Sequence, residues 1–231
     1  MKNFWHKIKM IWKDASLRRK VLFVLGALIV FRLLAAIPIP GIDTLALERF
    51  LTNNQFFGIL NIFSGGGLSN LSIIMLGVGP YITASIIMQL LTIMVPALKR
   101  LYHEEGEAGK KKFTQYSRLL TVPLAAIQGF SLLAILEQQG ILFDLTAFDR
   151  IMNLIVVVAG ALLLMWIGEL ISEFGIGNGV SILIFAGIVA AIPSSVSQLI
   201  FTFDPSQIPL YALFVVAGIL VIAGVVVVTE A

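Results

Sequence analysis

Six apolar stretches recur along the chain, and each is long enough, or nearly so, to cross a membrane as a helix. Five of them contain no charged residue, and the first contains only Arg32. A bilayer core about 30 Å thick requires roughly 20 helical residues, with about 17 as the lower end. The pattern predicts an all-α polytopic membrane protein. The stretches are residues 21–37, 72–97, 119–136, 151–168, 180–203 and 208–228.

The composition excludes several other classes of protein. Of the 231 residues, 58% are hydrophobic and 13% are charged, whereas soluble domains average about 45–50% apolar and about 25% charged residues. An ordinary soluble domain, a disordered tail and a fibrous repeat are therefore excluded. The chain contains no cysteine, which excludes a disulfide scaffold, a thiol enzyme and a cysteine-ligated metal site.

Basic residues are concentrated in two short segments, and this predicts the orientation in the membrane. Seven of the 16 Lys and Arg residues lie in 2–20, and six more lie in 99–118. Such clusters beside apolar stretches mark the cytoplasmic side. With a cytoplasmic N-terminus, alternation of the spans predicts that 98–118, 169–179 and the C-terminus lie inside, and that 38–71, 137–150 and 204–207 lie outside.

The first 20 residues are predicted to form a cytoplasmic amphipathic segment. Phe4, Ile8, Ile11 and Trp12 recur at helical spacing among lysines, as in helices that lie on anionic lipid. An irregular basic flank is the alternative. A signal peptide is not predicted, because the following apolar run exceeds about 7–15 residues and no small-residue cleavage site follows it.

The second span is preceded by an interrupted apolar run. Residues 56–63 are apolar except for Asn61 and are too few to cross the membrane, and Ser64 to Gly67 form a glycine cluster. We expect a half-helix that enters from outside, a turn, and a longer helix that begins near Pro80, since proline suits a first helical turn. Non-helical backbone at membrane depth requires a protein interior or a water-filled cavity, which favours a transport pathway. An ordinary glycine-rich external loop is the alternative.

A second glycine-rich break precedes the fifth span. Gly175, Gly177 and Gly179 alternate with other residues, but they do not form a G-x-G-x-x-G motif and no strand precedes them. We therefore predict a tight cytoplasmic turn rather than a nucleotide-binding loop.

Groups suited to catalysis are sparse. His6 and His103 lack the spacing of metal ligands, so no metal, cofactor or enzymatic activity is predicted. Glu169 and Glu173 lie one helical turn apart, and a solvated helix end is favoured over an acid–base pair. Arg32 is an intramembrane charge and hence a functional candidate by default, with snorkelling or pairing to a neighbouring helix as the alternative.

Six motifs, in order, resemble the bacterial SecY family, whose members form the channel subunit of the general protein-conducting channel. They occupy residues 31–32, 37–43, 61–66, 76–91, 105–116 and 175–179. The resemblance implies a clamshell of two inverted halves with a pore between them. It implies that 21–203 form the five-helix N-terminal half with its plug, and that 204–231 form a sixth helix that ends before the C-terminal half. Phe174 departs from the arginine found there in many members.

The resemblance also implies roles for individual residues. Branched apolar side chains are implied to form part of a pore ring, and their i,i+4 spacing places each pair on one helix face: Val78 with Ile82, and Val180 with Ile184. The lateral gate is implied to include Thr83, Ile86, Gln89 and Gln128, although amides within spans also serve as packing contacts worth about 0.6 kcal/mol. The implied plug comprises Leu60, Asn61, Ile62, Phe63, Ser64, Gly65, Gly66, Gly67, Leu68, Ser69 and Asn70.

The function implied is conduction of unfolded polypeptides across the bacterial inner membrane, with sideways release of transmembrane segments into lipid. The implied partners are SecE, SecG, the SecA motor, the ribosome, signal sequences and membrane lipid, with no direct contact to nucleic acid. The loops that dock SecA and the ribosome belong largely to the family's second half.

Two other classes remain open. Broken helices near an inverted-repeat axis also occur in secondary transporters, but these usually carry a charge near the bilayer midplane, and the spans contain only Arg32. A non-conducting membrane scaffold is disfavoured by the predicted half-helix and the glycine turns.

Overall fold

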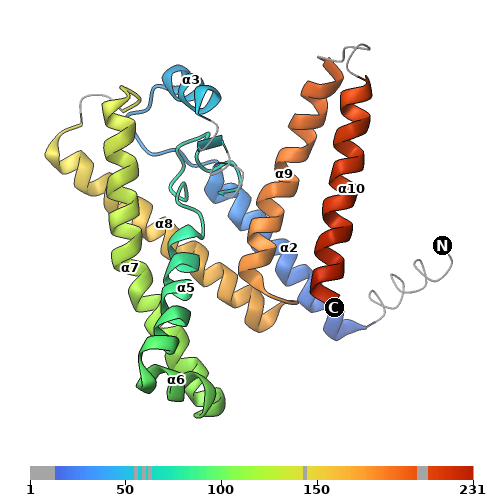
Figure 1. Ribbon diagram of the computed structural model, residues 1–231. Coiled ribbons are helices and arrows are strands. Elements are labelled where there is room, and N and C mark those ends of the chain that lie inside the picture. Colours follow the sequence, from blue (N-terminus) through green and yellow to red (C-terminus); the bar gives the residue numbers. More distant parts are fainter. Residues whose placement is uncertain are drawn as a thin grey trace. The chain divides into compact units, whose positions relative to one another are not determined.

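The computed structural model describes residues 14–54, 57–58, 61, 64–142, 145–201 and 208–230. Within these ranges the regular elements are helices, and two isolated bridges pair Pro38 with Ser72 and Ile42 with Leu142. The prediction of an all-α protein is confirmed. The helices are α2 (Ala15–Ala35), α3 (Thr44–Asn53), α5 (Gly79–Met94), α6 (Pro96–His103), α7 (Gly106–Gln138), α8 (Ala147–Phe174), α9 (Gly179–Phe201) and α10 (Ile208–Glu230) (Figure 1).

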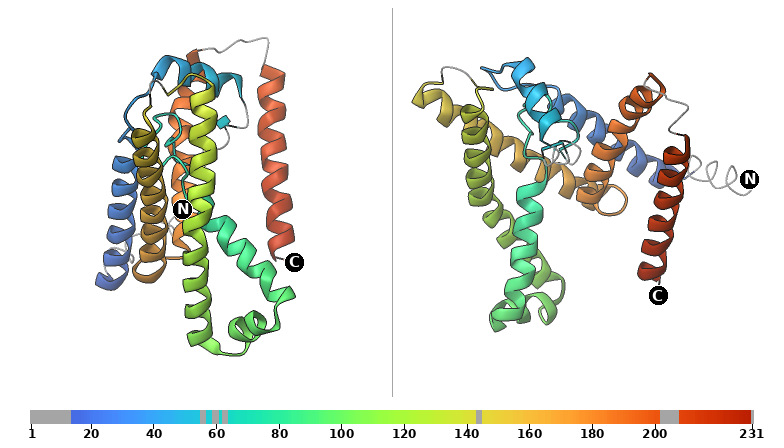
Figure 2. Two further views of the ribbon diagram at one scale, coloured as in Figure 1. Left: turned by 90° about the vertical axis from the view of Figure 1, so that its left-hand side faces the viewer. Right: turned by 45° about the horizontal axis from the view of Figure 1, so that its top comes forward.

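The chain divides into two compact units, residues 1–191 and 192–231. In the first unit, α5 packs beside α7, α7 packs against α8, and α8 packs in turn against α2 (Figure 2). The short helix α6 folds back onto α7. The second unit contains the end of α9 and the apolar helix α10.

Three of the described helices, α7, α8 and α10, are long and apolar enough to cross a membrane. The pair α5 and α6 gives a fourth candidate if the two are counted as one span, although they are bent by 111°. The helix α2 covers residues 21–35 of the first predicted span, 21–37, but its 21 residues include the basic run Arg18, Arg19 and Lys20 as well as Arg32. Membrane crossing by α2 and α9 therefore stays a prediction.

The expected span over 72–97 is wrong at both ends. Residues 73–78 form turns, and α5 begins at Gly79 with Pro80 in its first turn, as the position of this proline predicts. At the other end, Val95 has an extended conformation (φ −111°, ψ 107°). A residue that precedes proline disfavours the helical conformation, so the chain breaks before Pro96 and continues as α6.

Two other helices extend beyond the predicted spans. The stretches 119–136 and 151–168 lie inside α7 and α8, which add polar turns at both ends. The start of α8 is fixed by a capping box, in which Thr146 accepts from the Asp149 amide and the Asp149 carboxylate accepts from Thr146. A capping box satisfies amides that lack partners within the helix, so hydropathy alone underestimates the helix length.

The segment 64–78 fills the space among the helices of the first unit. Its Leu68, Leu71 and Met75 are buried in a cluster with Leu136 of α7 and Val157 of α8. Of the predicted half-helix, Phe57, Gly58 and Asn61 are helical. Leu60, Ile62 and Phe63 lie outside the described residues, as does the predicted amphipathic helix within 1–13.

The close approach of this segment to α8 depends on a glycine. A side chain at Gly160 would overlap the carbonyl oxygen of Ile73. Glycine therefore allows the helix backbone to pass directly against the non-helical segment.

Candidate functional site

An apolar cavity of about 560 Å³ lies between α5, α7, α9 and the segment 64–78. Leu68 and Ser64 of that segment border it, opposite Ile127 and Leu132 of α7. Apart from Ser64, Gln128 and Ser131, its lining is apolar or glycine. The full lining is Phe57, Ser64, Leu68, Met75, Leu76, Val78, Gly79, Ile82, Ile127, Gln128, Ser131, Leu132, Ile135 and Ile184.

A second cavity of about 440 Å³ has a partly polar lining and is called the polar cavity below. Hydroxyl, amide and carboxylate groups reach it from α5, from the end of α8 and from the start of α9. Its lining comprises Tyr81, Ile82, Ser85, Ile86, Gln89, Glu169, Ser172, Asn178, Val180, Ser181 and Ile184.

Ile82 and Ile184 line both cavities. Val78 borders the apolar cavity, and Val180 borders the polar one. All four side chains belong to one apolar cluster, whose centre includes Phe31. The structure thus brings the four predicted ring residues together in one apolar cluster, called the neck below, in which Ile82 and Ile184 border both cavities.

The start of α9 is positioned by one hydrogen bond to the end of α8 and by one to the residue that precedes α9. The backbone amide of Gly179 donates to Ser172 Oγ at 2.8 Å, and the amide of Ser181 donates to Asn178 Oδ1 at 3.1 Å. Gly177 has φ +72°, a conformation that glycine adopts at low cost. The prediction of a tight turn here is confirmed, and this turn directs Val180 and Ile184 toward the neck.

The segment at the apolar cavity is held by its own hydrogen bonds. Asn61 Oδ1 accepts from the Ser69 amide at 2.7 Å, and Ser64 Oγ accepts from the Leu68 amide at 3.2 Å. Because both acceptors are side chains, the turns are fixed without a regular helix. The described residues of the predicted plug, Ser64 to Asn70, therefore form a compact series of turns, called loop 64–70 below.

Two side-chain hydrogen bonds join loop 64–70 to α2. Arg32 Nη1 donates to the Gly65 carbonyl at 2.7 Å, and Asn70 Nδ2 donates to the Ala35 carbonyl at 3.2 Å. Arg32, the charge within the first predicted span, therefore contacts a turn, whereas the alternative interpretation expected it to snorkel or to pair with a neighbouring helix.

The predicted gate residues are distributed rather than gathered. Ile86 and Gln89 border the polar cavity, whereas Gln128 borders the apolar one. Thr83 borders neither of these two cavities, and its hydroxyl donates to the Gly79 carbonyl of its own helix at 3.0 Å.

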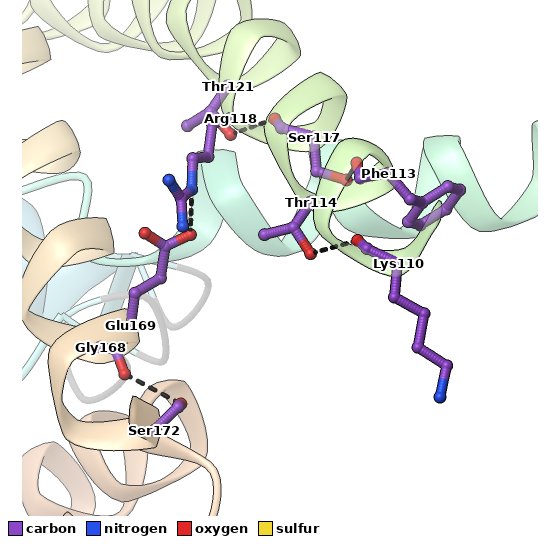
Figure 3. A network of polar contacts seen from close by, with 9 residues as sticks. All are labelled: Lys110, Phe113, Thr114, Ser117, Arg118, Thr121, Gly168, Glu169 and Ser172. Atoms are coloured by element: carbon purple, nitrogen blue, oxygen red, sulfur yellow. Dashed lines mark hydrogen bonds and ion pairs between the residues drawn. The ribbon is translucent and has the colours of Figure 1, made fainter. Parts of the chain in front are cut away.

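An ion pair joins α7 and α8 beside the polar cavity. Arg118 Nε lies 2.6 Å from Glu169 Oε1, and the two side chains point toward one another from the two helices (Figure 3). The expectation that Glu169 is a solvated group at a helix end is wrong, because its side chain is only 18% exposed and is paired. Glu173, one turn further, is exposed.

Sequence reasoning missed most of the polar lining. Tyr81, Ser85 and Gln89 recur every four residues in a mainly apolar helix, and residues at this spacing share a face. This pattern in the sequence could have predicted a polar face on α5. Ser172 had no comparable signal, because its place depends on the fold of the turn that follows it.

The fold and the site define a class, which is a helical membrane protein with an apolar cluster that borders two neighbouring cavities. The SecY sequence profile matches residues 72–231. The chain belongs to the SecY family.

Curated relatives agree with this membership. The chain is 39% identical to the protein translocase subunit SecY of Mycobacterium leprae, over 94% of this chain and 51% of the relative. It is 43% identical to that of Corynebacterium glutamicum, over 79% of this chain and 44% of the relative. It thus spans about half the length of these curated relatives.

Two solved structures share the fold. One is described as the structure of a protein conducting channel, and the other as Sec61 in the canine ribosome–channel complex. Each aligns with a TM-score of 0.53 at 21% identity, over 78% of this chain and 38% of the solved chain.

Proposed function

We propose that this chain supplies the N-terminal half of a Sec protein-conducting channel in the bacterial inner membrane, with its N-terminus in the cytoplasm. The observation that carries the proposal is the pair Ile82 and Ile184, which border both cavities at once. Apolar residues that border two cavities are suited to form a barrier between them.

The neck has the chemistry that a seal for an unfolded polypeptide requires. A narrow apolar constriction blocks ions by dewetting. It also gives a passing polar chain no hydrogen-bonding groups to which it would stick. The polar cavity beyond Ile82 is suited to receive the hydrated chain before it enters the neck.

In this proposal loop 64–70, with the preceding residues 60–63, acts as the plug of the resting channel. Ser64 and Leu68 border the apolar cavity directly beside Val78 and Ile82. Two side-chain hydrogen bonds join loop 64–70 to α2, and its Leu68 packs in the apolar core. An arriving polypeptide would displace the loop by breaking these contacts.

Lateral release and partner binding also belong to the proposal. Ile86 and Gln89 border the polar cavity, and Gln128 borders the apolar one, which supports a gate surface along α5 and α7. SecE, SecG, SecA, the ribosome and signal sequences are the partners proposed for the complete channel.

The test measures ion leak through a complete channel that carries this N-terminal sequence. Ile82→Ser and Ile184→Ser should each wet the neck and raise the resting conductance in planar bilayers. Ile87→Ser is the matched control, because Ile87 lies five residues from Ile82 and is rotated by about 140° around the helix. Equal leak from the Ile82 and Ile87 variants, or none from either, would contradict the proposal.

The same recordings also distinguish a pore from a secondary transporter, the alternative that membership of the SecY family disfavours. A coupled transporter gives small currents that depend on a substrate gradient, whereas a leaking pore conducts ions without one. Leak that requires a substrate gradient would favour the transporter.

A further inference from the structure

A third cavity lies away from the neck, between the end of α7 and the start of α8. Its volume is about 250 Å³, and Glu137, Arg150, Asn153, Leu133, Leu154 and Phe130 are among its lining residues. Phe130 at its border is 65% exposed, so the cavity lies at the surface of two helices that are apolar enough to cross a membrane.

Asn153 is the unusual member of this lining. Its side chain is almost fully buried, with 3% of the residue exposed, and its Nδ2 has no hydrogen-bond acceptor among the described residues. A buried amide without a partner costs about 1–3 kcal/mol. Such a group beside a cavity indicates a missing acceptor.

Charged groups of both signs stand at one end of the cavity. Arg150 of α8 forms an ion pair with Glu137 of α7. Asn153 follows Arg150 by three residues, which places it about 4.5 Å deeper along the helix and on the same face. Leu154, Leu133 and Phe130 line the cavity further from the charges.

The order of these groups is the order of groups in a phospholipid. Charges of both signs at the rim match a zwitterionic head group, the amide donor below them matches an ester carbonyl, and the apolar side chains match the start of an acyl chain. We propose that this cavity binds a zwitterionic glycerophospholipid with a protonated amine, of the phosphatidylethanolamine type.

Each contact has a defined direction. The lipid ammonium donates to the Glu137 carboxylate, Arg150 donates to the lipid phosphate, and Asn153 Nδ2 donates to an ester carbonyl. A quaternary ammonium lacks the N–H that Glu137 would accept. An anionic head group would face the carboxylate of Glu137. Phosphatidylcholine and phosphatidylglycerol should therefore both bind more weakly.

The test uses the purified 231-residue chain in lipid-free detergent. Each of the three lipids is added in turn, bound lipid is counted by native mass spectrometry, and the melting temperature is recorded. Phosphatidylethanolamine should bind most tightly and raise the melting temperature. No rise with this lipid would mean that the cavity holds only water, and would overturn the proposal.

Two variants separate lipid binding from structural roles. Asn153→Leu should weaken phosphatidylethanolamine binding by about fivefold, the loss of one hydrogen bond, without lowering the melting temperature in the absence of lipid. Glu137→Gln should shift the preference toward phosphatidylglycerol, because Arg150 then lacks its carboxylate. The matched control is Met152→Leu, beside Asn153 but outside the lining. Unchanged affinity in Asn153→Leu, or unchanged preference in Glu137→Gln, would overturn the assignment.

Discussion

Arg32 of α2 donates a hydrogen bond from Nη1 to the carbonyl oxygen of Gly65, with 2.7 Å between the two atoms. The neighbouring residue Phe31 closes the same contact from the other side, since a side chain at Gly65 would overlap its ring. Gly65 also has φ +68°, a region that disfavours other residues. The charged side chain of Arg32 and the ring of Phe31 therefore hold loop 64–70 against α2.

Removal of the Arg32 charge should make loop 64–70 open more easily. Arg32→Met deletes a hydrogen bond from a charged donor, and we expect local opening to become easier by about 1 kcal/mol because Arg32 is partly exposed. That change corresponds to about fivefold faster amide exchange over 64–70, measured by hydrogen–deuterium exchange with mass spectrometry. Arg19→Met, at an exposed position on the same helix, is the control. Equal exchange in the two variants would exclude a holding role for Arg32.

The passage of α8 against the segment 64–78 should depend on Gly160. Gly160→Ala places a methyl group against the Ile73 carbonyl, and overpacking of this kind costs about 1–3 kcal/mol. Gly26→Ala is the matched control, because nothing lies within 4 Å of a side chain there. Alanine in a helix is favoured by about 0.5–1 kcal/mol over glycine, so this control should be neutral or stabilising.

Unfolding in a detergent titration, followed by circular dichroism, measures both glycine variants. Gly160→Ala should unfold at a lower denaturant concentration than the parent chain, and Gly26→Ala should not. Equal shifts in the two variants would show that the close approach to Ile73 relaxes at no cost.

Hydropathy predicted where the helices lie but not where they end. The stretch 119–136 is the apolar part of α7, whose first turns contain Lys110 and Lys112 and continue outside any apolar window. The start of α8 depends on hydrogen bonds of Thr146 and Asp149, which carry no hydropathy signal. In contrast, Pro80 and Gly177 were read correctly, because their conformational preferences are local.

The site was predictable in its apolar part, because Ile82 and Ile184 were identified through motifs of the family. The ion pair of Arg118 with Glu169 was not, since the two residues are separated by 51 positions. Their pairing depends on how α7 and α8 pack. The hydrogen bond of Arg32 to Gly65 depends likewise on where a non-helical turn lies, and no periodicity encodes that.

The ion pair of Arg118 with Glu169 should couple α7 to α8. Their side chains are 44% and 18% exposed, so screening by solvent limits the coupling to about 0.5–1 kcal/mol. A double-mutant cycle with Arg118→Gln and Glu169→Gln in the detergent titration measures this coupling. The control cycle uses Lys110 and Glu107, an exposed pair within α7 with N···O 3.6 Å. Coupling no larger in the first cycle than in the second would deny the pair a role in helix packing.

The orientation in the membrane gives the last prediction, and the absence of native cysteine makes it accessible. Single cysteines are introduced at Lys111, an exposed position on α7, and at Ala147, an exposed position at the start of α8. Ala147 is preferred to Thr146, because Thr146 caps the helix. The two positions lie at opposite ends of the antiparallel pair α7 and α8, so a membrane that both helices cross separates them.

An impermeant thiol reagent added to intact cells should label the cysteine at Ala147 and leave the cysteine at Lys111 unlabelled. The reason is electrostatic, since Lys110, Lys111 and Lys112 form a basic run that favours the cytoplasmic side. Lysed cells provide the control, in which both positions should react. Labelling of the cysteine at Lys111 from outside would show that the chain has the opposite orientation in the membrane. The polar cavity, which Glu169 lines, would then face the exterior. A polypeptide leaving the cytoplasm would then meet the apolar cavity first.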